Sequence, residues 1–534
     1  MRSAGSVDTH HDRARGTLAR GNAAPKQIPW RNASVAILPP RELAVIIVSR
    51  GAHGAIAHVS TPAPGRTNPS VVTPYACFDP IQATATAIQV ACGGLLEPDR
   101  LQHVRARRLA CLLQTCVTRS PLYRKWLRGF DPASARLQDL PVAHRERLMR
   151  QFDDWVTDSS IRIDELRSFV SRPERIADTY RGRYIVWQSS GTSGEPGIFV
   201  QDATAMAAYD ALEAVRGPFM RWAMSPLVAA GLQRNLVLIG STEEHYASTV
   251  SAKRLRQLNP WFSQRLHDVS FLQPMPRLRQ ALEALDPIVM ATFPSVALQL
   301  AQEHRDGHLD ATPQEIWVGG ETLSPATREF IECTFGCRVR NSYGSSEFLS
   351  IAFECSQGVL HLNADWVILE PLDRHGRPVP LDVEGESVLL THLANHVQPL
   401  LRYVLPDRVT LHSRPCTCGS ALPVLTVHGR DDDVLRLPGR GRSTVTVSPL
   451  AITTVIEERA GLLDFQVQQV SQTGIALISR RNQAGEDARR HHAARALEVF
   501  LAELGAVGVR VTDEWRPMLS AGPGGKVRRV MALH

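Results

Sequence analysis

Hydrophobic positions along this chain repeat with two different spacings. Between residues 99 and 117, leucine and valine return every three or four positions, which predicts an amphipathic helix. The apolar runs NLVLIG (235–240) and PIVMATF (287–293) instead predict buried strands. The segment ATREFIECTF (326–335) predicts a helix that leads into the strand-like CRVRNSYG (337–344). Because strands and helices alternate, we expect an α/β fold with substantial parallel pairing.

The pattern changes towards both ends of the chain. From 366 to 413 it predicts a β-subdomain rich in strands and turns, and a long helix predicted at 485–504 lies between strand-like pieces. The first 85 residues are rich in Arg, Ala, Pro and Gly and show little periodicity, which predicts a poorly ordered extension. We therefore expect an extension (1–85), a large domain (86–428) and a compact C-terminal α+β domain (429–534).

Composition narrows the class of protein. A chain of 534 residues is too long for one hydrophobic core, and 43% apolar with 21% charged residues is typical of globular domains. The net charge of +7 is mild for this length, so we expect no nucleic-acid partner. The run LAVIIV (43–48) is too short to cross a membrane, and the odd number of cysteines, nine, favours reduced thiols. We expect a cytoplasmic protein with no membrane partner.

A loop rich in serine and glycine follows a short apolar stretch. QSSGTSGEPGIF (188–199) comes directly after YIVW (184–187), and hydroxyls with exposed backbone N–H groups at the end of a strand can wrap a phosphate. The kinase-type phosphate loop does not match, because Glu195 stands where a lysine is needed. A flexible surface linker is the alternative. The candidate phosphate contacts are Ser189, Ser190, Gly191, Thr192, Ser193 and Gly194.

Further motifs follow downstream in a fixed order. They are VGGE (318–321), NSYGSSEF (341–348), PLLRYVLPDRV (399–409), GRDDD (429–433) and GPGGKVRR (522–529). With the Ser/Gly loop, they resemble the motifs of the adenylate-forming superfamily, whose members make acyl-CoA thioesters through acyl-AMP.

Three other segments resemble the phenylacetate–CoA ligase branch of that superfamily. They are LMRQFDDWVTD (148–158), TFPSVALQLA (292–301) and CTCG (416–419). The resemblance runs from about residue 95 to the C-terminus. It implies a large adenylation domain with mostly parallel sheets and a β-subdomain, followed by a small mobile C-terminal α+β lid. Glu195 departs from the family loop, which often carries a lysine there.

The resemblance implies an ATP-dependent acid–thiol ligase that uses Mg²⁺. The expected reaction activates a carboxylic acid, which we expect to be an aryl acid, as acyl-AMP and transfers it to coenzyme A. A carrier-protein phosphopantetheine ends in the same thiol, so loading of a carrier protein is an open alternative. A nucleotide-binding scaffold without turnover is another. A homodimer also stays open.

The chemistry assigns roles to individual residues. Lys526 is expected to bridge the attacking carboxylate and the phosphate, Glu347 to hold Mg²⁺ and Ser346 to contact the α-phosphate. The resemblance implies a hinge at Asp432. The resemblance implies the other nucleotide contacts, which are Gly320, Glu321, Tyr343, Gly344, Asp407 and Arg430, and an acyl pocket that contains His245, Tyr246 and Phe293.

Four residues have the chemistry of a structural zinc site. Cys416 and Cys418 form a C-x-C pair, and Cys355 and His361 lie upstream. Three thiols and one imidazole suit tetrahedral zinc. The alternative is a β-turn with reduced cysteines.

Overall fold

The computed structural model describes residues 77–133, 136–189, 196–218, 234–480, 485–522 and 526–533. The predicted extension therefore lies almost entirely outside the described residues. Its expected end at residue 85 falls inside the first described helix, α1 (Pro80–Gly93), whose N-terminus is capped by the Asp79 carboxylate. A proline at its first position suits a helix start, because proline has no N–H to leave unpaired.

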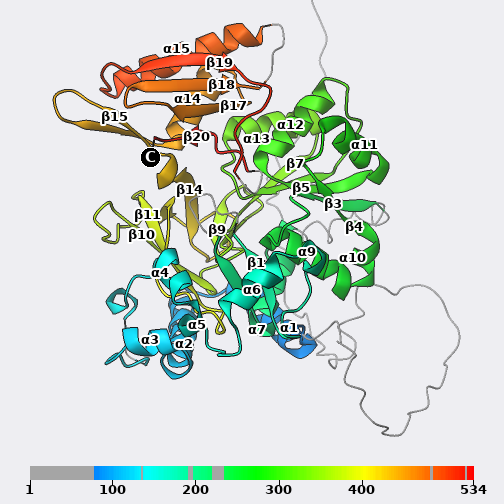
Figure 1. Cartoon of the computed structure of the whole chain (residues 1–534), viewed down its shortest axis with the longest axis vertical. Coiled ribbons are helices and arrows are strands. Elements are labelled where there is room, and N and C mark those ends of the chain that lie inside the picture. Colours follow the sequence, from blue (N-terminus) through cyan, green and yellow to red (C-terminus); the bar gives the residue numbers. More distant parts are fainter. Residues whose placement is uncertain are drawn as a thin grey trace, which may run out of the picture. The chain divides into compact units, whose positions relative to one another are not determined.

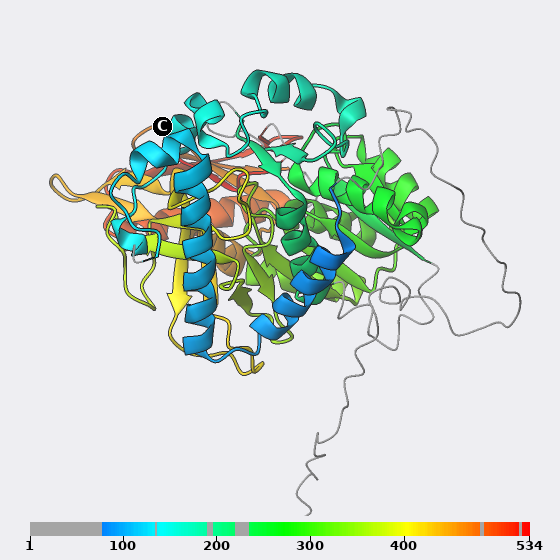
Figure 2. The same ribbon diagram turned by 90° about the horizontal axis from the view of Figure 1, so that it is seen from below.

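Helices form the first part of the large domain. The predicted helix at 99–117 is confirmed as α2 (Pro98–Arg119), and its buried face includes Leu109 and Leu112. In Figure 2 it is seen along its length, beside a yellow strand of the β-subdomain, and Arg108 stacks over Trp366 there. The shorter helices are α3 (Pro121–Trp126), α4 (Arg145–Arg150), α5 (Phe152–Trp155) and α6 (Ile163–Val170).

A nine-stranded sheet is the centre of the large domain (Figure 1). Its strand order is β13-β14-β9-β8-β7-β6-β5-β3-β4. The five strands from β4 to β7 pair in parallel, and the strands from β8 to β13 continue the sheet antiparallel. The bounds are β3 (Asn235–Gly240), β4 (Leu266–Ser270), β5 (Pro287–Thr292), β6 (Glu315–Gly319), β7 (Arg338–Tyr343), β8 (Ala352–Glu354), β9 (Leu360–Leu362), β13 (Asp407–His412) and β14 (Val424–Arg430).

Helices cover both faces of the parallel strands, as an α/β fold requires. On one face, residues of α11, α12 and α13 pack on the sheet, and on the other Trp261 and Phe262 of α10 pack against Leu236 and Ile288. The predicted helix at 326–335 is α13, which begins after the Ser324 cap. The bounds are α7 (Ala203–Val215), α9 (Ala247–Leu258), α10 (Pro260–Arg265), α11 (Met275–Leu285), α12 (Pro294–Arg305) and α13 (Pro325–Phe335).

Two smaller antiparallel sheets complete the large domain. The predicted β-subdomain contains the three-stranded sheet β10-β11-β12, and a separate hairpin flanks the Ser/Gly loop. The bounds are β10 (Val367–Leu372), β11 (Ser387–His392), β12 (Tyr403–Leu405), β1 (Ile185–Gln188) and β2 (Ile198–Gln201).

The C-terminal region, orange and red in Figure 1, has its own hydrophobic core. A four-stranded sheet, β19-β18-β17-β20, packs against two helices, which is the predicted α+β composition. The predicted helix at 485–504 is α15. The bounds are β15 (Leu435–Pro438), β16 (Thr444–Val447), α14 (Pro449–Ala460), β17 (Phe465–Gln469), β18 (Gly474–Ser479), α15 (Glu486–Glu503), β19 (Arg510–Trp515) and β20 (Val530–Met531).

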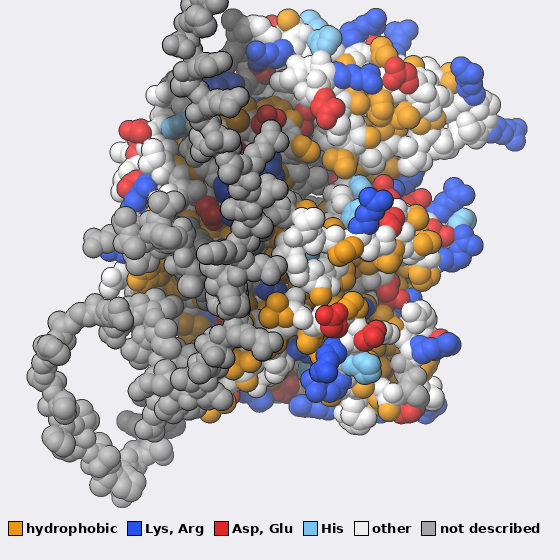
Figure 3. Space-filling view, turned by 180° about the vertical axis from the view of Figure 1, so that it is seen from behind, with side chains coloured by type: hydrophobic (Ala, Val, Ile, Leu, Met, Phe, Trp, Pro, Cys, Tyr) orange, Lys and Arg blue, Asp and Glu red, His pale blue; other side chains and the backbone are white. Residues whose placement is uncertain are grey.

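The surface of the described residues carries both signs of charge. Seen from behind, basic and acidic side chains lie interspersed among apolar ones (Figure 3). Among the described residues, no helix is long and apolar enough to cross a membrane.

Candidate active site

The predicted nucleotide residues meet at one edge of the large sheet, at the ends of β6, β7 and β14 and at the start of β13. Gly320 and Glu321 directly follow β6, and Tyr343 is the last residue of β7. Asp407 begins β13 and Arg430 ends β14, the strand paired with it. In open α/β sheets, ligands bind in the crevice at the carboxyl ends of parallel strands. The sheet therefore gathers residues that lie up to about a hundred positions apart in the sequence.

Two glycines allow close approach of the backbone at this edge. Gly320 has a φ of +78°, and a Cβ there would lie 3.1 Å from Phe293 Cε1 and 3.2 Å from Lys526 Nζ. A Cβ on Gly344 would lie 1.8 Å from the carbonyl oxygen of Leu349. Both positions need glycine, the first for its left-handed conformation and the second for space.

Tyr343 and Asp407 are joined by a hydrogen bond. The Tyr343 hydroxyl donates to Asp407 Oδ2 over 2.7 Å. Burial raises the pKa of the Asp407 carboxyl, while the bond from Tyr343 and the charges of Arg430 and Lys526 lower it. The tyrosine therefore favours the ionised carboxylate that a ribose hydroxyl would need as an acceptor.

Glu347 lies beside this pair, in a buried environment. Its Oε1 accepts a hydrogen bond of 2.9 Å from the Tyr403 hydroxyl, and burial raises the pKa of its carboxyl. The carbonyl of the preceding Ser346 accepts a bond of 2.7 Å from Trp187 Nε1, which fixes the backbone there. A buried carboxylate near Asp407 favours a cation, and Mg²⁺ is commonly held by one or two carboxylates together with substrate phosphates. The residues present thus fit the expected magnesium ion.

Lys526 reaches the same site from the C-terminal region. Its Nζ lies 5.4 Å from the centre of the Phe293 ring. Burial lowers the pKa of the lysine, and the carboxylates of Glu321, Asp407 and Glu347 act in the opposite direction. The structure therefore places Lys526 among three carboxyl groups and near Arg430, next to the predicted adenine and ribose contacts.

The segment GRDDD connects the large sheet to the C-terminal region. Asp432 lies in the single turn Asp431–Asp433 that follows β14, and its carboxylate accepts a hydrogen bond of 2.7 Å from Arg430 Nη2. Arg528 donates to the Asp432 carbonyl over 3.1 Å and to Asp433 Oδ1 over 2.6 Å. The predicted hinge residue thus stands at the connection itself.

The Ser/Gly loop is described only at its two ends. Ser189 N donates to the Gly197 carbonyl, and Gly197 N donates to Ser189 Oγ, each over 2.8 Å. These bonds close the base of the loop and engage the Ser189 hydroxyl. The predicted contacts Ser190, Gly191, Thr192, Ser193 and Gly194 lie outside the described residues.

The residues of the predicted acyl pocket have different surroundings. Phe293 lies at Gly320 and Lys526, and its ring packs edge-on against Phe271 at 5.8 Å. The His245 ring is 1% exposed and packs against Phe169 of α6, and burial lowers its pKa. Tyr246 directly precedes α9 and is half-buried. Phe293 thus lies beside Lys526, the predicted catalytic lysine, whereas the ring of His245 packs against α6.

Sequence reasoning missed Ser295, at the start of α12. Its backbone N and its Oγ each donate to the Glu321 carboxylate over 3.0 Å. The signal available in the sequence was the serine after Phe-Pro in TFPSVALQLA, which is typical of the first turn of a helix.

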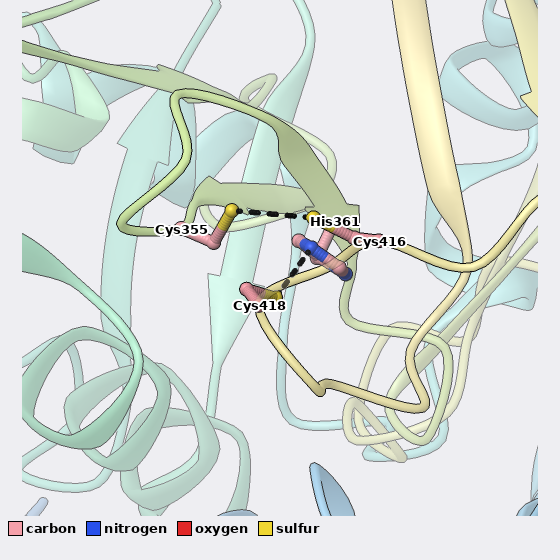
Figure 4. A group of neighbouring side chains, drawn as sticks. All are labelled: Cys355, His361, Cys416 and Cys418. Carbon is pink, nitrogen blue, oxygen red and sulfur yellow. Dashed lines mark hydrogen bonds between the residues drawn. The ribbon is translucent and has the colours of Figure 1, made fainter. Parts of the chain in front are cut away.

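The four predicted metal ligands come together (Figure 4). One ligand atom from each of Cys355, His361, Cys416 and Cys418 lies within 4.8 Å of the others. Cys355 Sγ and Cys416 Sγ are 3.8 Å apart, and Cys418 Sγ is 3.3 Å from His361 Nε2. Two thiolates at tetrahedral positions on one zinc ion would be about 3.8 Å apart. The other ring nitrogen of His361 lies 2.9 Å from the Leu422 carbonyl, as in metal sites where an outer partner orients the imidazole.

Known proteins resemble this chain in sequence and in fold. Residues 266–391 match the family described as AMP-binding enzyme, a segment that contains Glu321, Tyr343 and Glu347. Protein CapK of Staphylococcus aureus is 26% identical over 253 residues, so the match spans 46% of this chain and about half, 53%, of that protein.

Solved structures extend the likeness over most of the chain. 2-Hydroxyisobutyryl-CoA ligase in the postadenylation state with R3-HIB-AMP superposes with a TM-score of 0.60 at 21% identity, covering 83% of this chain and 91% of that one. The same ligase with 2-HIB-AMP gives 0.59 at 21% identity, covering 81% and 90%. The chain thus contains a segment that matches the AMP-binding enzyme family, and it shares the fold of 2-hydroxyisobutyryl-CoA ligase.

Proposed function

We propose that this protein is an ATP-dependent acid–CoA ligase that acts through acyl-AMP. The observation that carries the proposal is the position of Lys526, half-buried beside Gly320 and Phe293 among the carboxyl groups of Glu321, Asp407 and Glu347. An anion attacks an anion in this reaction, so a cation between them lowers the barrier.

In the first half-reaction, a carboxylate oxygen of the acid bonds to the α-phosphorus of ATP, and the bond to pyrophosphate breaks. Tyr343 offers a flat face for adenine, and Asp407 accepts from the ribose hydroxyls. Lys526 bridges the two reacting anions. Mg²⁺, held by Glu347, would neutralise phosphate charge.

In the second half-reaction, the sulfur of coenzyme A attacks the acyl carbonyl. The bond to AMP breaks, AMP leaves as the anion, and the thiol proton passes to solvent. We propose that rotation about Asp432 withdraws Lys526 between the two steps. The support is that Asp432 lies in the turn between β14 and β15. Such closure also excludes water, which would hydrolyse acyl-AMP.

The acid that we propose is an aryl acid. The support is the ring of Phe293, which lies beside Gly320 and Lys526 and packs edge-on against Phe271, so an aromatic surface faces the lysine.

We also propose that Cys355, His361, Cys416 and Cys418 hold one structural zinc ion. The support is that ligand atoms of three thiols and one imidazole lie within 4.8 Å of one another, and a closed set of four protein ligands is typical of a structural site. Metal analysis of protein purified without chelator should find about one equivalent of zinc. A content well below that would contradict the proposal.

The test of the function is acid-dependent pyrophosphate release. Purified protein is incubated with ATP, Mg²⁺ and a panel of aryl and alkyl acids, and acyl-AMP is trapped with hydroxylamine. We expect release with aryl acids and a roughly 10²–10³-fold lower rate in Lys526→Ala, as for removal of one transition-state contact. Silence with every acid, while ATP binds, would contradict the ligase. Product formation with a loaded carrier protein but not with coenzyme A would contradict the proposed acceptor.

A further inference from the structure

The Glu321 carboxylate joins two parts of the chain that lie far apart in the sequence. Its Oε1 accepts hydrogen bonds of 3.0 Å from Ser295 Oγ and from the backbone N of Val527. Its Oε2 accepts a third, also of 3.0 Å, from the backbone N of Ser295. Ser295 belongs to the large domain, and Val527 directly follows Lys526. The bond from Val527 spans 206 residues.

This junction is partly buried, which makes each donor important. Burial raises the pKa of the Glu321 carboxyl, whereas both Ser295 bonds, the Val527 bond and the charge of Lys526 lower it. A buried carboxylate that loses a donor pays a desolvation penalty, and hydrogen bonds to charged groups are among the stronger ones. Loss of the hydrogen bond between Val527 and Glu321 is therefore expected to cost free energy.

We propose that Glu321, aligned by Ser295, is a latch that holds the Val527 amide and so positions Lys526 for adenylation. The proposal rests on the proposed function, and it gives Glu321 a role beyond the nucleotide contact implied by resemblance. Consecutive Cα atoms are about 3.8 Å apart, so a fixed Val527 N restricts the Lys526 backbone to a small volume. The same carboxylate attracts the Lys526 ammonium.

A second contact supports the same arrangement farther along the chain. Glu457 Oε1, on α14, accepts from Thr327 Oγ1 of the large domain over 3.3 Å and from Arg529 Nη1 over 2.5 Å. The segment after Lys526 is therefore held at two points, by Glu321 at Val527 and by Glu457 at Arg529. Of these two contacts, the Glu321 bond lies next to the lysine, so its loss is expected to free Lys526 more directly than loss of the Glu457 bond.

The latch affects the two half-reactions differently. Adenylation needs Lys526 in the site, so weakening the latch slows it. Transfer to the thiol needs Lys526 withdrawn, so the latch must then be broken and its loss does not slow that step. A merely structural role would slow both.

The first experiment measures burial of Lys526 and needs no substrate. Holoprotein is treated briefly with an amine-acetylating reagent, and labelling of each lysine is followed by mass spectrometry. In Glu321→Gln, we expect Lys526 to be labelled roughly tenfold faster or more, the range for loss of a hydrogen bond to a charged group. Lys253, which donates to the Thr242 carbonyl in the large domain, should not change. Ser295→Ala removes one donor and should give a smaller increase.

The matched control is Glu303→Gln. Glu303 lies on α12, as Ser295 does, and pairs with Arg279 over 2.8 Å within the large domain. The Glu303→Gln substitution makes the same chemical change at a carboxylate that does not contact Val527. An increase in Lys526 labelling equal to that of Glu321→Gln, or no increase in either latch variant, would overturn the proposal.

The second experiment separates the half-reactions. Pyrophosphate release should slow roughly tenfold or more in Glu321→Gln, while coenzyme A transfer from supplied acyl-AMP keeps its rate. Equal slowing of both steps would overturn the latch. If the wild type adenylates no acid, the proposed function fails, and the labelling result alone decides the latch.

Discussion

Replacing Tyr343 by phenylalanine tests how the site prepares Asp407 for the nucleotide. The substitution keeps the aromatic face and removes only the hydroxyl that donates to Asp407 Oδ2 over 2.7 Å. A hydrogen bond to a charged group contributes about 1.5–3 kcal/mol, so ATP is expected to bind roughly 10- to 150-fold more weakly.

The same substitution should also change how ATP affinity depends on pH, in a defined direction. The Tyr343 bond lowers the pKa of Asp407, whereas burial raises it. Without the hydroxyl, the pKa of Asp407 rises further, and more of the carboxyl is protonated at a given pH. Only the carboxylate accepts from both ribose hydroxyls, so the loss of ATP affinity should be larger at low pH than at high pH.

The assay is calorimetric titration with ATP across a pH series. The matched control is Tyr180→Phe, which removes a similar tyrosine–carboxylate bond of 2.8 Å to Glu165, outside the site. It should leave ATP binding unchanged. An ATP affinity of Tyr343→Phe within about twofold of the wild type, where the bond's usual strength requires at least tenfold, would refute the reasoning.

Three further results are expected. Burial lowers the pKa of Lys526, and the charged form of the lysine is the active one, so the initial rate of pyrophosphate release should fall as pH rises through that pKa. An active Lys526→Arg variant should show this fall at a higher pH. If the fall stays at the same pH in that variant, it belongs to another group. Cys418→Ser should reduce bound zinc from about one equivalent to near none and lower the melting temperature, whereas the exposed Cys111→Ser should do neither. Gly344→Ala should accumulate poorly in the soluble fraction, because its Cβ would lie 1.8 Å from the Leu349 carbonyl oxygen; normal yield and melting temperature would show that the turn can shift.

Much of the fold could be predicted from local patterns. The buried strand at 287–293 and the helices at 99–117 and 485–504 carry their own periodicity, and the structure has β5, α2 and α15 there. Short-range signals sufficed because a helix or strand buries one face in a hydrophobic core, so its apolar residues repeat with the period of that element. The expected boundary at residue 85 had no such signal, and α1 crosses it.

Part of the site was also predictable. The motif order identified Tyr343, Asp407 and Lys526 as candidates, and the chemistry of three cysteines and one histidine gave four candidate metal ligands. The structure brings each set together.

The sequence by itself therefore determined which residue types stand at the ends of which strands. Only the tertiary structure decided which of them are partners. Glu321 carries nothing in its sequence neighbourhood to indicate that its carboxylate meets the amide of Val527, 206 residues away, with Ser295 as the third member. A buried carboxylate takes whichever donors the packed chain brings within about 3 Å. That depends on how the C-terminal region meets the large sheet, which no local pattern specifies.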